Sequence, residues 1–194
     1  PSIRAAAIGE FAVAYSGNAT DGPTQVLYSG LLADEWYASG TFPTRQEVDI
    51  RNISENNSTL QQVTRLLYRA RSAAESARQN YADLGPNEAG HAEVTNLAGY
   101  SYVLFGENYC SGVPFSEVDS SGDFVYGEPQ STAAIFRDHA VARFQEAITI
   151  AREEGSSAQE NLARIGLGRA LLNLGEYEAA AEAVASVPTE FRYE

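Results

Sequence analysis

The sequence predicts an all-α protein, a right-handed α-solenoid of antiparallel helix pairs that forms one domain over residues 1–194. Three observations predict this class. Nearly every long segment carries apolar residues at helical spacing, and no stretch alternates steadily between apolar and polar residues. Segments rich in Gly, Pro and Asn separate these runs. The last two predicted helices also have the spacing of a helical repeat.

The N-terminal third predicts two helices, near 2–16 and 23–38, followed by a loop over 36–57. The clearest helix follows this loop. Ser58 and Gln61 have the spacing of a capping box, in which each side chain satisfies a backbone donor of the other residue. A narrow apolar seam then runs along about six turns, through Leu60, Val63, Leu67, Ala70, Ala74, Ala77 and Tyr81. Gly85-Pro86 is predicted to end this helix, because proline cannot donate the next hydrogen bond.

Two further helices are predicted in the middle of the chain. Asn87 can cap the first, whose core face is Val94, Leu97, Ala98, Ser101, Leu104 and Phe105. A loop with Gly112, Pro114, Gly122, Gly127 and Pro129 follows. The second helix covers 132–153, with the buried stripe Phe136, Ala140, Phe144, Ala147, Ile148 and Ala151.

Gly155 is predicted to stop that helix, and Ser157 with Glu160 forms a second capping box. The final helices, near 158–173 and 176–187, resemble one tetratricopeptide repeat. The matching positions are a small residue where the helices cross, a turn glycine, an aromatic and a second small residue: Gly168, Gly175, Tyr177 and Ala180. Arg164 and Val184 depart from the repeat, which usually has aromatic residues there.

The charge balance excludes several partners. All 13 basic residues are arginines, and 26 acidic residues give a net charge of −13. This field would repel nucleic acid and anionic lipid headgroups, so neutral or cationic ligands are expected. The longest apolar run is too short to span a membrane.

The sequence offers no catalytic or metal site. His91 and His139 lie on different predicted helices without partners at ligand spacing, and the 119–123 loop lacks the spacing of a calcium loop. We therefore expect no enzyme activity, no catalytic residue, no metal and no cofactor. Cys110 is the single cysteine, so no disulfide forms within the chain, and we expect a small buried apolar residue at a helix end.

Aromatic residues are the better candidates for ligand binding, because sugars present flat apolar faces beside hydroxyl edges. One candidate patch joins aromatic rings to planar polar groups and comprises Trp36, Tyr37, Phe42, Arg45, Arg51 and Asn52. A second patch is formed by Phe124 and Tyr126. Each has a structural alternative: Trp36 and Tyr37 could finish a helix and pack under the loop, and Phe124 and Tyr126 could pin their own loop to the helices.

Three segments, in this order, resemble the SusD/RagB family of nutrient-binding lipoproteins. They are Leu31-Leu-Ala-Asp-Glu35, the stretch Arg65-Leu-Leu-Tyr-Arg-Ala-Arg71 with the helical residues that follow it, and the block from Gly99-Tyr to Val113-Pro114 that continues into Ser131-Thr-Ala-Ala-Ile-Phe. The last block is the specific one. Members of this family are usually more than twice as long, so the resemblance implies that residues 1–194 are the N-terminal, helical-repeat portion of the family fold.

The resemblance implies a bacterial cell-surface protein, lipid-anchored in the outer membrane in its full-length form. Such proteins act with a TonB-dependent transporter in nutrient uptake and bind an oligosaccharide or peptide ligand. They are usually not enzymes. By position, the resemblance points to the 36–57 loop as a place of ligand contact. A helical-repeat scaffold, a structural subunit for protein–protein assembly, is the alternative that the residues leave open.

Overall fold

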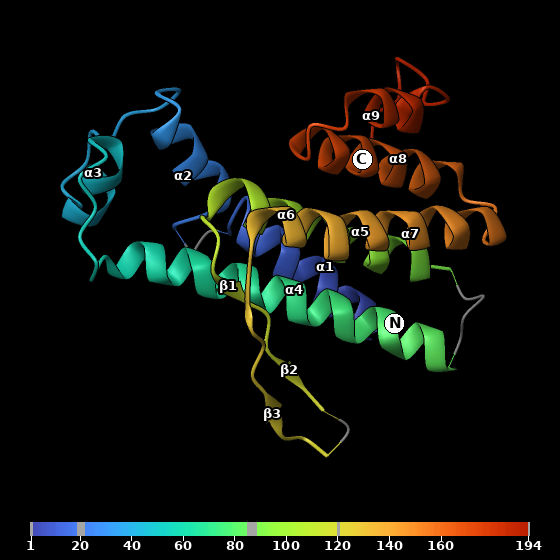
Figure 1. The fold of residues 1–194 in the computed structure, drawn as a ribbon. Coiled ribbons are helices and arrows are strands. Elements are labelled where there is room, and N and C mark those ends of the chain that lie inside the picture. The colour runs from blue at the N-terminus through green and yellow to red at the C-terminus, as the bar shows by residue number, and fades with distance from the viewer. Residues whose placement is uncertain (1, 19–21, 85–88, 120, 194) are drawn as a thin grey trace.

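The computed structural model describes residues 2–18, 22–84, 89–119 and 121–193, and these are mostly helical (Figure 1). The helices are α1 Ser2–Tyr15, α2 Gln25–Leu32, α3 Pro43–Asp49, α4 Ser58–Leu84, α5 His91–Asn108, α6 Thr132–Ala134, α7 Ala142–Glu153, α8 Ser157–Asn173 and α9 Tyr177–Val184, with a π-helical segment at Ile135–Val141 between α6 and α7. The all-α class predicted from the periodicity is confirmed at this level. Within the described ranges, no helix is long and apolar enough to cross a membrane.

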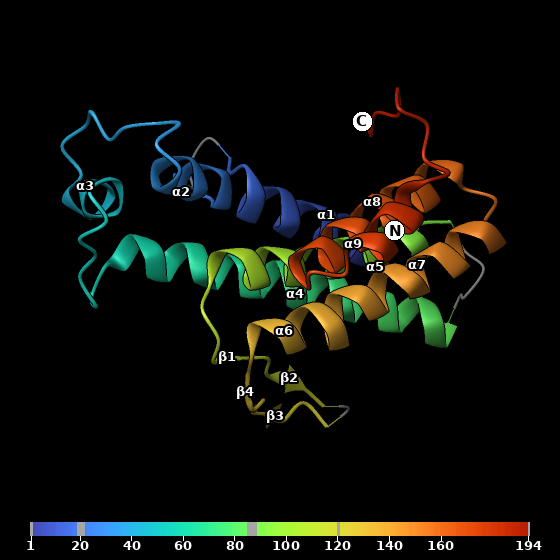
Figure 2. The same cartoon turned by 45° about the horizontal axis from the view of Figure 1, so that its top comes forward.

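Helix α5 is the centre of the molecule, since it packs against α1, α4, α7, α8 and the π-helical segment. Most of its residues are buried on every side, and its predicted core face is buried apart from the partly exposed Leu97. Helix α1 lies along α4, and α7, α8 and α9 pack one against the next in chain order (Figure 2). Helices α2 and α3 lie at one end of the long helix α4 (Figures 1 and 2).

The alanine seam of α4 is buried against a neighbouring helix, as predicted. Ala70, Ala74 and Ala77 are fully buried, and Ala7 and Ala14 of α1 pack against the same face. Methyl side chains on both helices let the two backbones approach closely, so this contact needs no large residue. The seam prediction is confirmed for its central positions, while Leu60 and Tyr81 at its two ends are only partly buried.

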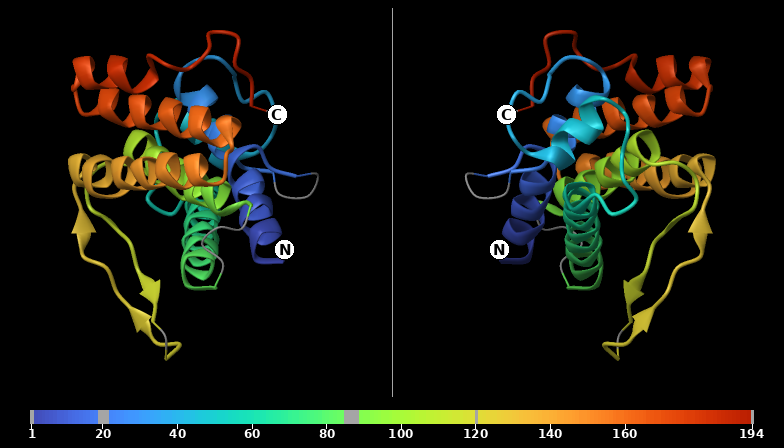
Figure 3. Two further views of the ribbon diagram at one scale, coloured as in Figure 1. Left: turned by 90° about the vertical axis from the view of Figure 1, so that its right-hand side faces the viewer. Right: turned by 90° about the vertical axis from the view of Figure 1, so that its left-hand side faces the viewer.

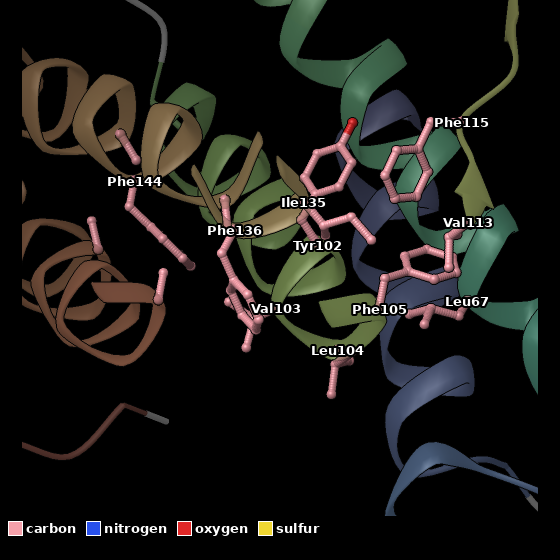
Figure 4. Packing of buried hydrophobic residues seen from close by; sticks show 14 of the residues in the cluster. Leu67, Tyr102, Val103, Leu104, Phe105, Val113, Phe115, Ile135, Phe136 and Phe144 are labelled. Atoms are coloured by element: carbon pink, nitrogen blue, oxygen red, sulfur yellow. The ribbon is translucent and has the colours of Figure 1, made fainter. Parts of the chain in front are cut away.

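Glycines of α5 and α8 make room for aromatic rings of the 132–153 helix. A side chain at Gly99 or Gly166 would collide with the ring of Phe144, and one at Gly106 would collide with Phe136. Both rings are buried within the main hydrophobic cluster (Figure 4). The sequence predicted that glycines allow helices to cross closely. At these three positions, the missing side chain leaves space for an aromatic ring.

The predicted helix 132–153 forms as one continuous helical run from Thr132 to Glu153, and its π-helical turns contain His139. The wider π-helical turns place this imidazole flat against Tyr102, with the ring centroids 4.7 Å apart. Burial lowers the pKa of His139 below its ordinary value, so the ring is neutral near pH 7.

Two helix caps lie one residue away from the predicted ones. Asn57, not Ser58, caps α4, because its Oδ1 accepts a hydrogen bond from the backbone N–H of Leu60. Likewise Ser156, not Ser157, caps α8 by accepting from Gln159. Gly155 and Gly175 both have the positive φ that ends a helix, as predicted.

Two sequence predictions concern the connection between α4 and α5. Gly85, Pro86 and Asn87 lie outside the described residues. Helix α4 is described as far as Leu84. Helix α5 begins at His91, after a left-handed Gly90.

The structure differs from the sequence prediction in two regions. Helix α3 lies inside the expected 36–57 loop, and α2 ends at Leu32 instead of near residue 38. The expected loop after α5 is a two-stranded arm that projects from the helical layers (Figure 3). Its antiparallel pairs are β1 Val113–Pro114 with β4 Pro129–Gln130, and β2 Glu117–Val118 with β3 Phe124–Val125.

Phe115 anchors this arm. Its ring is buried and lies 5.0 Å from that of Tyr102 and 5.2 Å from that of Phe105, centroid to centroid (Figure 4). The loop is therefore pinned by an aromatic residue, but by Phe115 and not by Phe124 or Tyr126.

Cys110 is exposed, which corrects the expectation of a buried residue. It follows the end of α5, where the chain turns outward into the arm. We expect the native protein to react with one equivalent of a thiol reagent such as dithionitrobenzoate, without denaturant, because the sulfur is accessible. A thiol that reacts only after unfolding would contradict this placement.

Candidate functional site

A small pocket of about 170 Å³ lies beside α2 and α3 and is lined by four of the predicted ligand-binding residues, Trp36, Tyr37, Phe42 and Arg45. Leu27 and Leu31 of α2 also line it. The pocket thus combines aromatic rings, an aliphatic surface and one guanidinium group. Its walls come from α2, from the segment that joins α2 to α3, and from Arg45 of α3.

Trp36 is held against the backbone of α2. Its indole lies directly over Gly30, where any Cβ would overlap the ring. The backbone N–H groups of Glu35 and Trp36 both donate to the carbonyl oxygen of Gly30, at 3.0 and 3.3 Å. About half of Trp36 (51%) remains exposed. Trp36 lies beyond the last residue of α2, so it does not finish that helix. One part of the residue is held against Gly30, and the rest is open to solvent.

Arg45 and Phe42 line the pocket and contact each other. The guanidinium carbon of Arg45 lies 4.3 Å from the ring centroid of Phe42, a cation–π contact. The same guanidinium lies against Gly22. Tyr37 also lines the pocket and is 79% exposed, so most of this residue is open to solvent.

Side chains from α3 and the α4 cap fix the loop that carries these rings. Asp49 accepts a hydrogen bond from the backbone N–H of Ala38, at 3.0 Å. The amide of Asn57 donates to the carbonyl oxygen of Thr44 and to the carboxylate of Glu47, both at 2.8 Å. The pocket is therefore preorganised by hydrogen bonds.

Two predicted residues of this patch do not line the pocket. Arg51 forms an ion pair with Asp34 at 2.7 Å and donates to the carbonyl oxygen of Leu32, also at 2.7 Å, so it joins the end of α2 to the end of α3. Asn52 is exposed, and its backbone N–H donates to the carbonyl oxygen of Glu47. Their contacts in the structure support the local fold.

Phe124 and Tyr126 lie on the projecting arm, away from this pocket (Figures 1 and 3). They are 71% and 83% exposed, so the alternative that they pin their loop to the helices is wrong. The structure thus separates the two predicted patches: residues of the first line one pocket, and Phe124 of the second lines a different hollow beside α4.

A buried charge cluster escaped the sequence analysis. The Glu75 carboxylate accepts hydrogen bonds from Arg78 and Arg143, both at 2.8 Å, and from the Tyr102 hydroxyl at 3.0 Å. Glu146 also pairs with Arg78. The signal was available as two i, i+3 charge pairs, Glu75 with Arg78 on α4 and Arg143 with Glu146 on α7, which further ion pairs join to each other.

The cluster shifts the pKa values of its members. Burial opposes the charge on Glu75, but Arg143 and Arg78 outweigh it and hold the pKa of this carboxyl group below its ordinary value. Burial, together with Glu75, raises the pKa of Tyr102 to about 12. Each carboxylate oxygen of Glu75 is already bonded, so the cluster is arranged to hold helices together.

Over the part of the chain that the structure describes, no three His, Cys, Asp or Glu side chains lie together as metal ligands. Comparison with known proteins identifies no relative: no protein family, no curated protein and no solved structure matches the chain. The pocket and the folded helices are therefore the observations from which a function has to be argued.

Proposed function

We propose that the chain is the helical part of a cell-surface nutrient-binding protein that captures a glycan. The aromatic pocket beside α2 and α3 carries this proposal. A half-exposed indole on a rigid support, a second ring and a guanidinium group are the features that receive the flat face and the hydroxyl edge of a sugar ring. A volume of about 170 Å³ suits one ring of a longer ligand.

The resemblance to SusD/RagB proteins supplies the rest of the proposal. On this resemblance we propose that the protein acts at the bacterial outer membrane with a TonB-dependent transporter and binds its ligand without catalysis. Trp36 and Tyr37 come directly after the segment Leu31-Leu-Ala-Asp-Glu35, which carries the first part of that resemblance. The residues of the pocket thus lie where the resemblance points.

We propose further that α8 and α9 form a tetratricopeptide-like repeat within a right-handed α-solenoid. Gly168 supports this, because a Cβ there would lie 2.7 Å from Val184 of the partner helix and 3.2 Å from the carbonyl oxygen of Ala180. Gly175 has φ +77° in the turn between the two helices. The side-by-side order of α7, α8 and α9 agrees with such an arrangement.

Trp36→Ala tests the pocket. We expect it to weaken binding of a neutral oligosaccharide, identified on a glycan array, by about tenfold in calorimetry, because it removes the stacking platform. Tyr37→Ala should weaken binding less and leaves the fold intact, since the side chain is mostly exposed.

Tyr177→Ala is the matched control, because Tyr177 is an exposed aromatic residue on α9, outside the pocket. Circular dichroism should report the same helix content for all three variants. Unchanged affinity in both Trp36→Ala and Tyr37→Ala would remove the pocket from the proposal.

A scaffold role is the second candidate, favoured by exposed apolar residues on the last helix pair. Leu172 and Tyr177 are both mostly exposed where α8 turns into α9. A protein partner could cover them. An array that gives no glycan, together with a Leu172→Ser variant that loses a partner found by cross-linking, would favour the scaffold.

A further inference from the structure

A groove runs along the outward face of α4, beside the projecting arm and separate from the Trp36 pocket. It consists of two neighbouring hollows of about 450 and 300 Å³ that share Arg71, Ser72, Glu117 and Val118. Along α4 the groove extends from Arg65 to Asn80, which at 1.5 Å per residue is about 22 Å. This length suits an extended, linear ligand.

Arg71 gives the groove an unusual charge. Only 3% of the residue is exposed, and its Nη2 donates to the carbonyl oxygen of Ser116 at 2.5 Å. Its guanidinium carbon lies 5.4 Å from the ring centroid of Phe115. Among the described residues, Nε has no acceptor and no carboxylate lies within ion-pair distance. A buried guanidinium without an anionic partner favours the arrival of an anion.

Arg65 adds a second cation at the same groove. It lies on α4, is exposed, and has no ion pair or hydrogen bond within the described part of the chain. Arg69, between these two, pairs with Glu10 of α1. Glu117 is the one acidic side chain of the larger hollow and opposes the two arginines. The unneutralised charge of this hollow is therefore positive, in a chain whose net charge is −13.

The smaller hollow is also lined by Glu75 and Arg78, which pair with each other, and the remaining walls of the groove are mostly ring faces, hydroxyls and amides. Tyr68 and the exposed Phe124 line the larger hollow, and Ser72, Ser76, Gln79 and Asn80 line the smaller one. Short hydroxyls and amides suit a ligand that carries many hydroxyl groups, and a ring face suits the apolar face of a sugar. An Arg fork is the group that binds a carboxylate most directionally.

We propose that this groove binds an acidic oligosaccharide, one whose sugar units carry carboxylates, as uronic acids do. The carboxylate lies against Arg65 and the Arg71 end of the groove, and a sugar face packs on Phe124. This site is distinct from the Trp36 pocket and does not depend on it. It gives the protein a way to bind an anionic ligand despite its acidic surface.

The probe is a linear oligogalacturonate, titrated calorimetrically into the full chain at low and at high salt. Its methyl ester serves as the matched neutral ligand, because it has the same rings without the charges. We expect the acid to bind about tenfold more tightly than the ester, with a preference that falls as salt rises. Equal affinities would overturn the proposal, and so would the absence of binding.

Variants then assign the site. Arg65→Gln should weaken binding of the acid by about fivefold and leave the ester unchanged, whereas Glu117→Gln should strengthen binding of the acid. Phe124→Ala should weaken both ligands, because it removes a ring face. Arg192→Gln is the control, since it changes the net charge equally at an exposed arginine whose guanidinium donates to the carbonyl oxygen of its neighbour Phe191.

Two outcomes separate this inference from others. Trp36→Ala should leave binding of the acid unchanged, so failure of the Trp36 pocket and failure of this groove are distinguishable. An oligoglutamate peptide that binds more tightly than oligogalacturonate, and that also depends on Arg65, would identify an acidic peptide as the occupant and overturn the assignment to a sugar.

Discussion

We expect Phe144→Ala to lower the free energy of unfolding by about 3–5 kcal/mol, the largest effect of any single substitution considered for this chain. The ring is fully buried and fills the space that Gly99 of α5 and Gly166 of α8 leave open. Alanine would leave a cavity that three helices border, and none of them can move in without the others. Urea unfolding followed by circular dichroism measures the loss.

Gly166→Ala tests the same contact from the other side. It should also destabilise the protein, because a Cβ there collides with the Phe144 ring. Gly9→Ala is the matched control: Gly9 lies in α1 with no atom near its added Cβ, so this change should stabilise by about 0.5–1 kcal/mol. In the Phe144→Ala background, Gly166→Ala should lose its cost. Equal effects of the two glycine substitutions in the native background would contradict the packing described here.

Glu75→Gln should lower the free energy of unfolding by about 3 kcal/mol near neutral pH, because it removes the more buried of the two carboxylates that Arg78 and Arg143 share and leaves them Glu146 alone. All three side chains are mostly buried, so water replaces the lost contacts poorly. Glu178→Gln, at an exposed position of α9, is the control and should change stability little.

The pH dependence of this effect has a definite sign. The pKa of Glu75 is lowered in the folded protein, so its contribution to stability is present above its unfolded value of 4.5 and is lost as the pH falls through the lowered value. The difference between the native protein and Glu75→Gln should therefore shrink below pH 4.5. A difference that stays constant down to the acid transition would exclude the carboxylate charge as its cause.

Local signals were enough to predict most of the helices. The seam of α4, the core face of α5 and the stripe of the 132–153 helix each repeat over several turns, so a few exceptions do not hide them. The caps moved by one residue because Asn57 and Ser58, like Ser156 and Ser157, are adjacent residues that can both cap a helix. Sequence alone does not decide which of two adjacent capping residues caps the helix.

The missed elements depend on contacts between distant residues. Helix α3 has seven residues and a single fully buried side chain, Val48, so it leaves almost no periodic signal. The strands of the arm have two residues each, too few to show alternation. Their pairing joins Val113 to Gln130 across an intervening segment that sequence periodicity cannot describe.

The candidate site was predicted in part. Residue type and proximity along the chain identified Trp36, Tyr37, Phe42 and Arg45, which do line one pocket. The same reasoning included Arg51, whose left-handed backbone and ion pair with Asp34 give it a structural role instead. Arg71 was not singled out, because its lack of an acidic partner becomes visible only once the arm is folded over it.

The attachment of the arm has a consequence for how such a protein can diversify. The chain leaves the helices at Val113 and returns at Gln130, where the Gly112 N–H donates to the Gln130 carbonyl oxygen at 2.7 Å. Beyond Phe115, the tip with Phe124 and Tyr126 is largely exposed. Substitutions or insertions in this tip, or its replacement, would leave the hydrophobic core of the domain intact. Ligand preference at the proposed groove could therefore evolve while the rest of the molecule stayed the same.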